Sequence, residues 1–187
     1  MDSGNIGFVL LCAAFVFVMT PGLAMFYGGL VRKKNVVNTM MTSIFIIGVG
    51  IVMWVLFGYS LSFSPSGNAF IGDFRWLGLE GVSLTEGYTD GASIPNMVFS
   101  AFQMMFAVIT PALITGAVAG RMKFKSIFVF TIFWSLIVYY PLAHMVWGQG
   151  GLLGADGIGA LDFAGGDVVH ISSGVSALVL CILLGKR

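Results

Sequence analysis

Four polar side chains lie within long apolar stretches of the sequence, where each could bind or pass on a small polar molecule. They are Gln103, His144, Asp162 and His170. A polar group inside a membrane costs free energy unless it has a partner, so each is a candidate functional residue. His144 and His170 are the only histidines, and no thiol cluster has metal-ligand spacing. We therefore expect neither a metal site nor a cofactor.

His170 and Asp162 each allow two interpretations. A predicted helix over 163–185 places His170 about two turns below the outer helix end, roughly 10 Å at 1.5 Å per residue. There it is either a structural histidine with satisfied hydrogen bonds or a pore-lining group, because a neutral imidazole both accepts and donates. Asp162 begins the same helix, where its carboxylate would cap free backbone amides. Its alternative role is to attract cations to an external mouth.

Three aromatic residues could form a cation site. Phe102 and Phe106 are four residues apart and therefore lie on one helix face, while Trp147 ends the fourth apolar stretch. Packing would explain the phenylalanine pair, and anchoring at the membrane surface would explain the tryptophan. The alternative is that an indole face attracts a small cation, an interaction worth about 0.5 to 2 kcal/mol.

Membrane-spanning helices must position these residues, because the composition excludes a water-soluble domain. Hydrophobic residues make up 58% and charged residues 9% of the chain, whereas soluble domains are about 25% charged. Five stretches without charge, at 3–31, 35–72, 91–120, 126–155 and 168–185, are long enough to cross a bilayer, which takes roughly 20 residues. Such continuous runs fit helices and not the alternating strands of a barrel. The expected helices are 5–30, 36–62, 95–119, 125–146 and 163–185, with an external loop at 63–94.

The charged residues predict how the helices are oriented. One end receives Arg32, Lys33, Lys34, Arg121, Lys123, Lys125, Lys186 and Arg187. The other end receives all eight acidic residues and only Arg75. Because cytoplasmic loops are enriched in Lys and Arg, we expect a multi-pass protein of the cytoplasmic membrane with its N-terminus outside and its C-terminus inside. Topology explains the basic residues, so a nucleic acid is not an expected partner. No enzyme motif is present, and we do not expect an enzyme.

Four segments of the chain form a recognisable set. They are Thr20–Leu23 with Phe26–Gly29, Ala101–Gln103 with Phe106–Ala107, Ala143–Gly148, and a C-terminal signature of Asp162–Gly166, Val169, His170, Ser173, Gly174, Ala177, Gly185 and Arg187. Together they resemble the ammonium transporter family, specifically its Amt branch, and the resemblance runs through the whole chain. It implies an all-α membrane protein whose five helices form the first inverted repeat of an eleven-helix fold.

The resemblance implies a role for each candidate residue. Trp147, Phe102 and Phe106 match the external site that recruits ammonium, and Phe106 also matches the outer gate. Asp162 matches the acid that supports this site. His170 matches the first of two paired pore histidines, where ammonium loses its proton before passage. Moving neutral ammonia through an apolar pore costs far less than moving a cation. The implied function is transport of ammonium, and of methylammonium, across the cytoplasmic membrane.

The resemblance also implies partners, because family members contain two repeats with the pore between them. We expect the remaining C-terminal helices, two further copies in a homotrimer, and the lipid bilayer. The chain is then a fragment, a split gene product or one part of a divided protein. The alternative function is an ammonium sensor of the same fold, coupled to a nitrogen-regulatory signal protein or a fused signalling domain.

Overall fold

Helices form the whole membrane-crossing part of the chain that the structure describes. The computed structural model describes residues 1–155 and 157–186. Asp156 and Arg187 lie outside these residues. Both were used to predict the orientation of the helices, and Arg187 is also the last residue of the C-terminal signature. Five helices in the described ranges are long and apolar enough to cross a membrane, namely Ser3–Leu30, Lys33–Phe63, Asn96–Val118, Phe124–Trp147 and Gly166–Leu184. The predicted all-α fold with five spans is confirmed.

Two of the five spans are single helices and three are built from shorter segments. The single helices are α1 (Ser3–Leu30), which continues through Pro21, and α4 (Asn96–Val118). The second span consists of η1 (Lys33–Asn35), α2 (Val36–Met53), the π-helical η2 (Trp54–Gly58) and α3 (Tyr59–Phe63). The fourth consists of α5 (Phe124–Trp134), the π-helical η4 (Ser135–Tyr139) and α6 (Tyr140–Trp147). The fifth consists of the π-helical η5 (Gly166–Ile171) and α7 (Ser172–Leu184).

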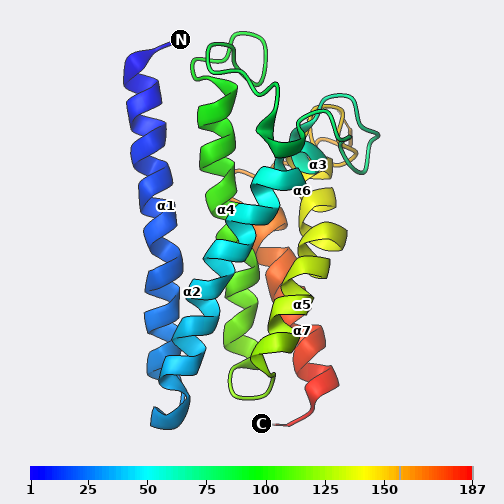
Figure 1. Cartoon of the computed structure of the whole chain (residues 1–187). Coiled ribbons are helices and arrows are strands. Elements are labelled where there is room, and N and C mark those ends of the chain that lie inside the picture. The colour runs from blue at the N-terminus through cyan, green and yellow to red at the C-terminus, as the bar shows by residue number, and fades with distance from the viewer. Residues whose placement is uncertain (156, 187) are drawn as a thin grey trace.

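The third span is central to the bundle. α4 contacts α1, α2, α5 and α7, while α3 packs against α6 (Figure 1). The two chain ends lie at opposite ends of the bundle, as an odd number of spans requires (Figure 1). Gly58 permits the close approach of the second and fourth spans, because a Cβ there would lie 2.7 Å from the Tyr140 ring. Small residues allow such backbone contact between membrane helices.

The connection between α3 and α4 covers one end of the bundle, which we call the loop end. It contains one short helical turn, η3 (Leu77–Leu79), and is otherwise irregular. Trp76 of this connection stacks on Tyr59 with ring centroids 5.3 Å apart, and Tyr88 stacks on Phe99 at 4.8 Å. These stacked rings hold the loop on the helices beneath it, because offset aromatic pairs are stabilising.

Hydroxyl groups join several spans inside the bundle by hydrogen bonds. The indole of Trp54 donates to Ser100 in α4 at 3.3 Å, and that of Trp134 donates to Ser176 in α7 at 2.8 Å. Ser43 and Thr115 bond each other across α2 and α4 at 3.1 Å. Each bond joins two spans, and unpaired groups at these positions would be costly in lipid.

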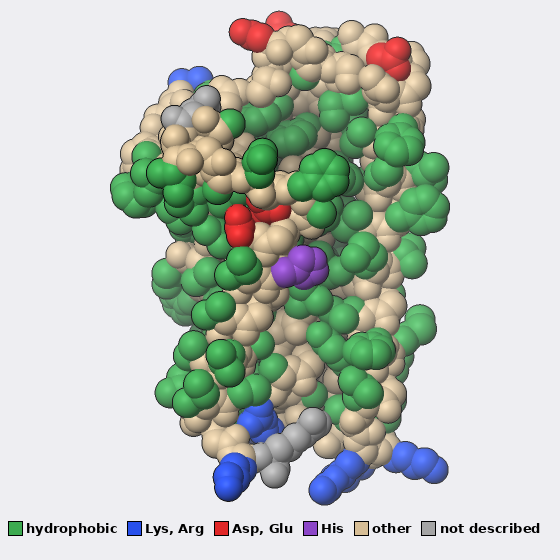
Figure 2. Space-filling model, turned by 180° about the vertical axis from the view of Figure 1, so that it is seen from behind, with side chains coloured by type: hydrophobic (Ala, Val, Ile, Leu, Met, Phe, Trp, Pro, Cys, Tyr) green, Lys and Arg blue, Asp and Glu red, His purple; other side chains and the backbone are tan. Residues whose placement is uncertain are grey.

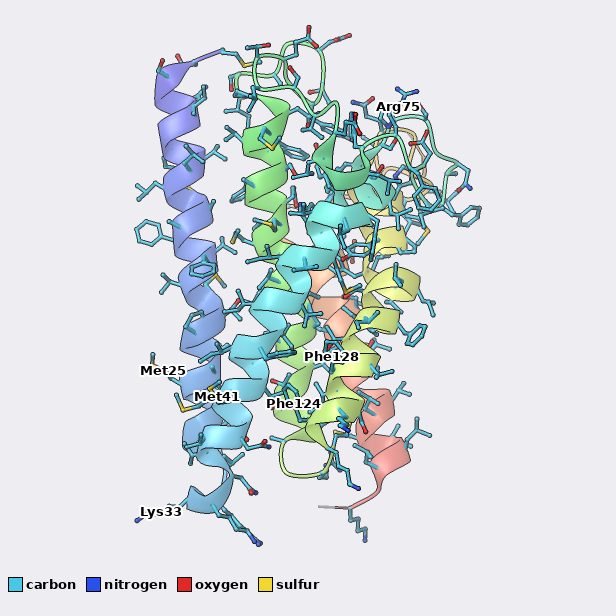
Figure 3. The ribbon with its side chains drawn as sticks, in the orientation of Figure 1. Met25, Lys33, Met41, Arg75, Phe124 and Phe128 are labelled. Carbon is cyan, nitrogen blue, oxygen red and sulfur yellow. The ribbon has the colours of Figure 1, made fainter. Side chains whose placement is uncertain are left out.

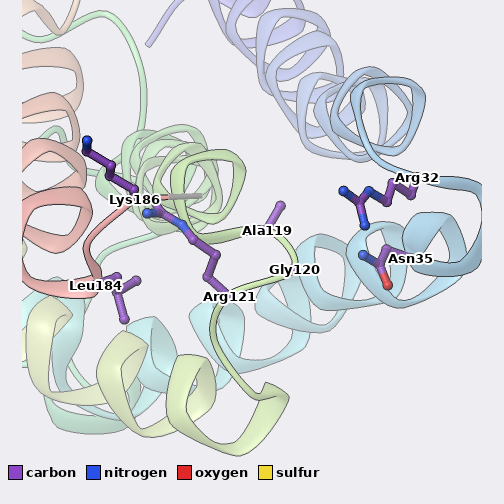
Figure 4. Close-up of a pocket in the computed structure, with 7 residues that line it drawn as sticks. All are labelled: Arg32, Asn35, Ala119, Gly120, Arg121, Leu184 and Lys186. Carbon is purple, nitrogen blue, oxygen red and sulfur yellow. The ribbon is translucent and has the colours of Figure 1, made fainter.

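The opposite end, which we call the basic end, carries a polar pocket of about 420 Å³. Its lining includes Arg32, Asn35, Arg121 and Lys186 (Figure 4). The guanidinium of Arg121 donates to the carbonyl of Ala117 and to that of Gly185, both at 2.7 Å. It thereby caps the C-terminal ends of α4 and α7, where unpaired carbonyls and the helix dipole favour a cation.

Candidate functional site

The structure brings the three predicted aromatic residues together. The rings of Phe102 and Phe106 are 5.0 Å apart at 84°, and those of Phe106 and Trp147 are 6.4 Å apart at 65°. Phe106 therefore joins a face of α4 to the end of α6. All three side chains are partly exposed. Their arrangement presents an aromatic surface at which a small cation could bind.

The loop end of α6, which carries Trp147, is held by neighbouring loops. Gln149 donates from its backbone N–H to the Tyr88 hydroxyl at 3.1 Å and from its side-chain amide to the Tyr88 carbonyl at 2.9 Å. One turn before Trp147, the ring of His144 is fully buried. Its Nδ1 lies 3.1 Å from the carbonyl oxygen of Ser62 and its Nε2 lies 2.8 Å from that of Asn68.

His144 thus ties α6 to Ser62 in α3 and to Asn68 in the α3–α4 connection, a role that the sequence did not reveal. The sequence marked it as a polar residue in an apolar helix, but its partners lie 82 and 76 residues away. The sequence indicated this role only indirectly, because a buried histidine needs hydrogen-bond partners. The partners themselves become visible only in the fold.

The Asp162 carboxylate caps the start of the fifth span, as one of its two interpretations predicted. It accepts hydrogen bonds from the backbone N–H groups of Gly166 at 2.7 Å and of Asp167 and Val168 at 3.0 Å each. Gly165, which lies between Asp162 and these amides in the chain, adopts a left-handed conformation with φ of 77°. That residue reverses the chain, and a Cβ there would also lie 3.0 Å from Val169.

His170 is nearer the start of its helix than the sequence predicted. The fifth helix begins at Gly166 and not at 163, so His170 lies about one turn from its start instead of two. The difference arises because residues 162–165 form the cap and the left-handed turn. The orange start of this helix lies well below the top of α4 (Figure 1), so His170 is still within the bundle's length.

The His170 side chain is exposed on one face of the molecule. With Asp162, Phe163 and Asp167 it lines an open pocket of about 260 Å³. Figure 2 shows an exposed histidine below acidic side chains and among hydrophobic ones on this face. In the part of the chain that the structure describes, its ring makes no hydrogen bond. The η5 segment that carries it packs against both α4 and α6, and so lies beside the helices of the aromatic residues.

Gln103, the fourth polar candidate, has a buried side-chain oxygen with no hydrogen-bond partner among residues 1–155 and 157–186. A buried acceptor without a partner costs about 1–3 kcal/mol. Over the same residues, no group of three histidine, cysteine or carboxylate side chains is arranged to hold a metal ion.

Comparisons with known proteins agree on one family. The sequence pattern described as Ammonium Transporter Family matches residues 7–187. The chain is 53% identical over its whole length to an ammonium transporter of Bacillus subtilis, of which it spans 45%. It is 45% identical to ammonium transporter 1 of Dictyostelium discoideum, of which it spans 40%.

Solved structures give the same result. The fold matches the crystal structure of Candida albicans Mep2 with a TM-score of 0.88 and 34% identity, over all of this chain and 40% of that one. It also matches a protein described as a sensor Amt protein, with a TM-score of 0.83 and 27% identity, over 98% of this chain and 44% of that one. The chain spans less than half the length of these relatives. Because the family pattern covers almost every residue, this multi-pass membrane chain belongs to the Ammonium Transporter Family.

Proposed function

We propose that the protein containing this chain transports ammonium, and methylammonium in its place, across the cytoplasmic membrane. The observation that carries the proposal is the placement of the exposed His170 on an element that packs against the helices bearing Phe106 and Trp147. A cation site and a proton-accepting group then follow one another along one route. Membership of the family supports the same reading.

In this proposal Trp147, Phe102 and Phe106 recruit ammonium from outside the membrane. Their faces attract a small cation by about 0.5–2 kcal/mol, and more where water is excluded. Asp162 supports the site through the charge of its carboxylate, although three backbone amides occupy its oxygens. Phe106 lies between the other two rings and acts as the outer gate, which must move to let the substrate pass.

Beyond the gate, ammonium loses its proton and ammonia passes His170. A full cation would lose its hydration in an apolar path, and that loss is far more costly than moving a neutral molecule. An imidazole without a hydrogen-bond partner can accept a bond from one neighbour and donate to the next. This supports the pore-lining interpretation of His170 over that of a satisfied structural histidine.

The remaining helices of the transporter supply the other wall of the pore. Next to His170 the apolar side chains of Leu161 and Phe163 are almost completely exposed, at 95% and 102% of their full area. The pocket that they line contains the polar side chains of Asp162, Asp167 and His170, which are costly against lipid, so another structure is expected to cover it. We further propose that the complete protein is a homotrimer, with the N-terminus outside and the C-terminus of this segment inside.

An ammonium sensor is the second candidate function, because one structural relative is described as a sensor Amt protein. In that case the same aromatic site binds ammonium, and the signal passes to a nitrogen-regulatory protein or a fused domain. Reconstituting the natural-length protein in liposomes separates the two functions. An inward ammonium gradient should produce protein-dependent uptake and a change in internal pH. Tight ammonium binding without any flux would reject transport in favour of sensing.

A further inference from the structure

A small polar cavity lies between α2 and the end of α4, near the basic end of the bundle. Its volume is about 10 Å³, which is about the least space that one water molecule needs. The lining residues that matter here are Thr39 and Thr42 of α2, Thr115 of α4, Ala119 and Gly120 of the turn after α4, and Met122. Figure 3 shows Met41, which lies between the two α2 threonines in the sequence, near the lower end of α2 with Lys33 beyond it.

Thr39 places a buried hydroxyl on the wall of this cavity. The residue is 4% exposed, and its Oγ1 has no hydrogen-bond partner in the described part of the chain. Thr42 and Thr131 instead donate to the carbonyl oxygen four residues earlier in the same helix. For Thr39 that carbonyl belongs to Asn35, which ends the 3-10 turn before α2. A buried hydroxyl without a partner is costly, so this one needs a partner that lies in the cavity.

Two further hydroxyls on the wall can accept hydrogen bonds. Thr42 donates its hydrogen to a carbonyl oxygen of α2 at 2.7 Å, and Thr115 donates to one of α4 at 2.8 Å. A hydroxyl oxygen has two lone pairs, so each of these can still accept. Thr115 uses one lone pair toward the Ser43 hydroxyl, which lies 3.1 Å away, and keeps the other. One water can therefore accept from Thr39 and donate to both hydroxyls, and a buried water typically makes about three such bonds.

Water can reach this cavity from the basic end. Ala119 and Gly120 line both the cavity and the polar pocket of about 420 Å³ at that end (Figure 4). A Cβ at Gly120 would lie 3.2 Å from the side-chain nitrogen of Asn35, so a larger residue would crowd the junction of the two spaces. The φ of 73° at Gly120 also favours glycine. The cavity therefore extends inward from a pocket that charged side chains line at the membrane surface.

We propose that this cavity is a hydration site, which holds one water molecule between Thr39, Thr42 and Thr115. The water accepts the hydrogen of Thr39 and donates to the other two hydroxyls, so it joins α2 to α4 beside the direct bond between Ser43 and Thr115. A polar bridge between spans is stabilising, because lipid offers these groups no other partner. The site involves neither the aromatic residues nor the open pocket beside His170, and it does not depend on which substrate the protein moves.

A crystal structure of the natural-length protein, at a resolution that shows ordered waters, tests the site directly. We expect a water peak about 2.5–3.0 Å from the Oγ1 of Thr39. Thr39→Val keeps the shape of the side chain but removes the donor, so the peak should be lost. Thr39→Ser keeps the hydroxyl and should retain the peak. Thr131→Val is the matched control, because it removes a buried hydroxyl that is already bonded within α5 at 2.9 Å, and it should also retain the peak.

Radiolytic labelling of the natural-length protein in bilayers gives the second arm of the test. A short X-ray pulse turns bound water into hydroxyl radicals that oxidise the nearest side chains, and Met122, which lines the cavity, is the reporter. Thr39→Val should remove most of the Met122 oxidation, whereas Thr39→Ser and Thr131→Val should not. If Thr39→Val does not fold, Thr42→Val removes one acceptor of the same water and should lower the oxidation. A site without density, a peak or Met122 oxidation that survives Thr39→Val, or a side chain of the remaining helices inside the cavity would each overturn the proposal.

Discussion

The two histidines of this chain show how the surroundings decide what a residue can do. His144 is fully buried, and each ring nitrogen faces a backbone carbonyl. It can therefore hold two segments together but has no capacity left for a substrate. His170 is exposed on the open face and, within the described residues, has no hydrogen bond to its ring. Both of its ring nitrogens therefore remain available there to accept or donate a hydrogen bond.

Replacing Trp147 by Leu tests the aromatic site. Leucine fills the space at the end of α6 but offers no cation-binding face, so the site loses about 0.5–2 kcal/mol of attraction. We expect methylammonium uptake in membrane vesicles to need about two- to thirty-fold more substrate for half its maximal rate. Insertion and assembly should stay normal. An unaltered concentration dependence would reduce Trp147 to a membrane anchor.

Replacing Asp162 by Asn tests the cap of the fifth span. Asparagine keeps one acceptor oxygen but loses the charge-assisted bonds that the carboxylate receives from three backbone amides. We expect unfolding to become easier by about 1–3 kcal/mol, together with slower uptake. Folded yield and uptake are compared side by side. Full uptake at normal yield would show that the carboxylate is a dispensable cap.

At the scale of single residues, spacing in the sequence correctly predicted features that depend only on neighbours in the chain. The four-residue interval between Phe102 and Phe106 predicted that their rings lie on one helix face, and the structure gives 5.0 Å between them. The position of Asp162 before a glycine-rich turn predicted its cap. The partners of His144 could not be predicted in this way, because Ser62 and Asn68 reach it only after the second and fourth spans have packed.

At the scale of elements, composition predicted the spans but not where each one ends. The fifth helix begins at Gly166 because Gly165 turns the chain with a positive φ, and apolarity alone does not report such a turn. An external loop was predicted at 63–94, and the α3–α4 connection is mostly irregular. Its attachment by the stacked pairs Trp76–Tyr59 and Tyr88–Phe99 depends on tertiary packing and could not be predicted.

Arg121 connects two helix ends, so its loss should loosen the basic end. Arg121→Met keeps the length of the side chain but leaves the carbonyls of Ala117 and Gly185 without their donor. We expect a loss of about 1–3 kcal/mol in the free energy of unfolding, measured by thermal unfolding in detergent. Lys123→Met removes a nearby exposed charge and is the matched control. Equal stability of the two variants would contradict the capping role.

Asp73 makes the α3–α4 connection sensitive to acid. The Ser64 hydroxyl, which donates to the Asp73 carboxylate, lowers the pKa of that carboxyl, and the backbone N–H of Arg75 adds to the effect. A lowered pKa means that the carboxylate stabilises the fold above the unfolded value of about 3.9. This contribution disappears as the pH falls through the folded value.

Pepsin cleavage between residues 64 and 95 should therefore increase as the pH falls below about 4. In Asp73→Asn the residue no longer titrates, so the part of this increase that belongs to Asp73 should be absent. Asp73 is well hydrated, and a modest change is expected. Cleavage between residues 64 and 95 is measured for both proteins at each pH. It is divided by cleavage at a site in another loop, which corrects for the pH dependence of pepsin itself. Identical profiles for the two proteins would show that Ser64 and Asp73 do not hold the connection closed.

At the scale of the whole molecule, five spans leave one face of the bundle unfinished. His170, Leu161 and Phe163 are exposed together on it, and Gln103 has a buried oxygen that no described residue satisfies. The relatives are more than twice as long as this chain. A second repeat of opposite topology would cover such a face and place the path between the repeats. The other four spans all contact α4.

This arrangement makes a prediction about the 187 residues expressed alone. The chain should insert as five spans with its C-terminus inside, because apolar length and flanking positive charge determine insertion. It should not conduct ammonium, since one wall of the path is missing. Reporter fusions at both termini measure the orientation, and uptake of methylammonium by cells measures conduction. Co-expression of the remaining helices from a relative such as the Bacillus subtilis transporter should restore uptake.

In the restored protein, His170→Ala should abolish uptake or change its dependence on pH, because the chain of hydrogen-bonding groups through the apolar path would be interrupted. His144→Ala is the informative comparison, since it removes the other histidine but acts on the attachment of α6 to Ser62 and Asn68. It should lower the folded yield, while the protein that does fold keeps the normal pH dependence. Robust uptake by the isolated five-helix chain would instead mean that two copies complete one pore, despite the charge asymmetry that favours a single orientation.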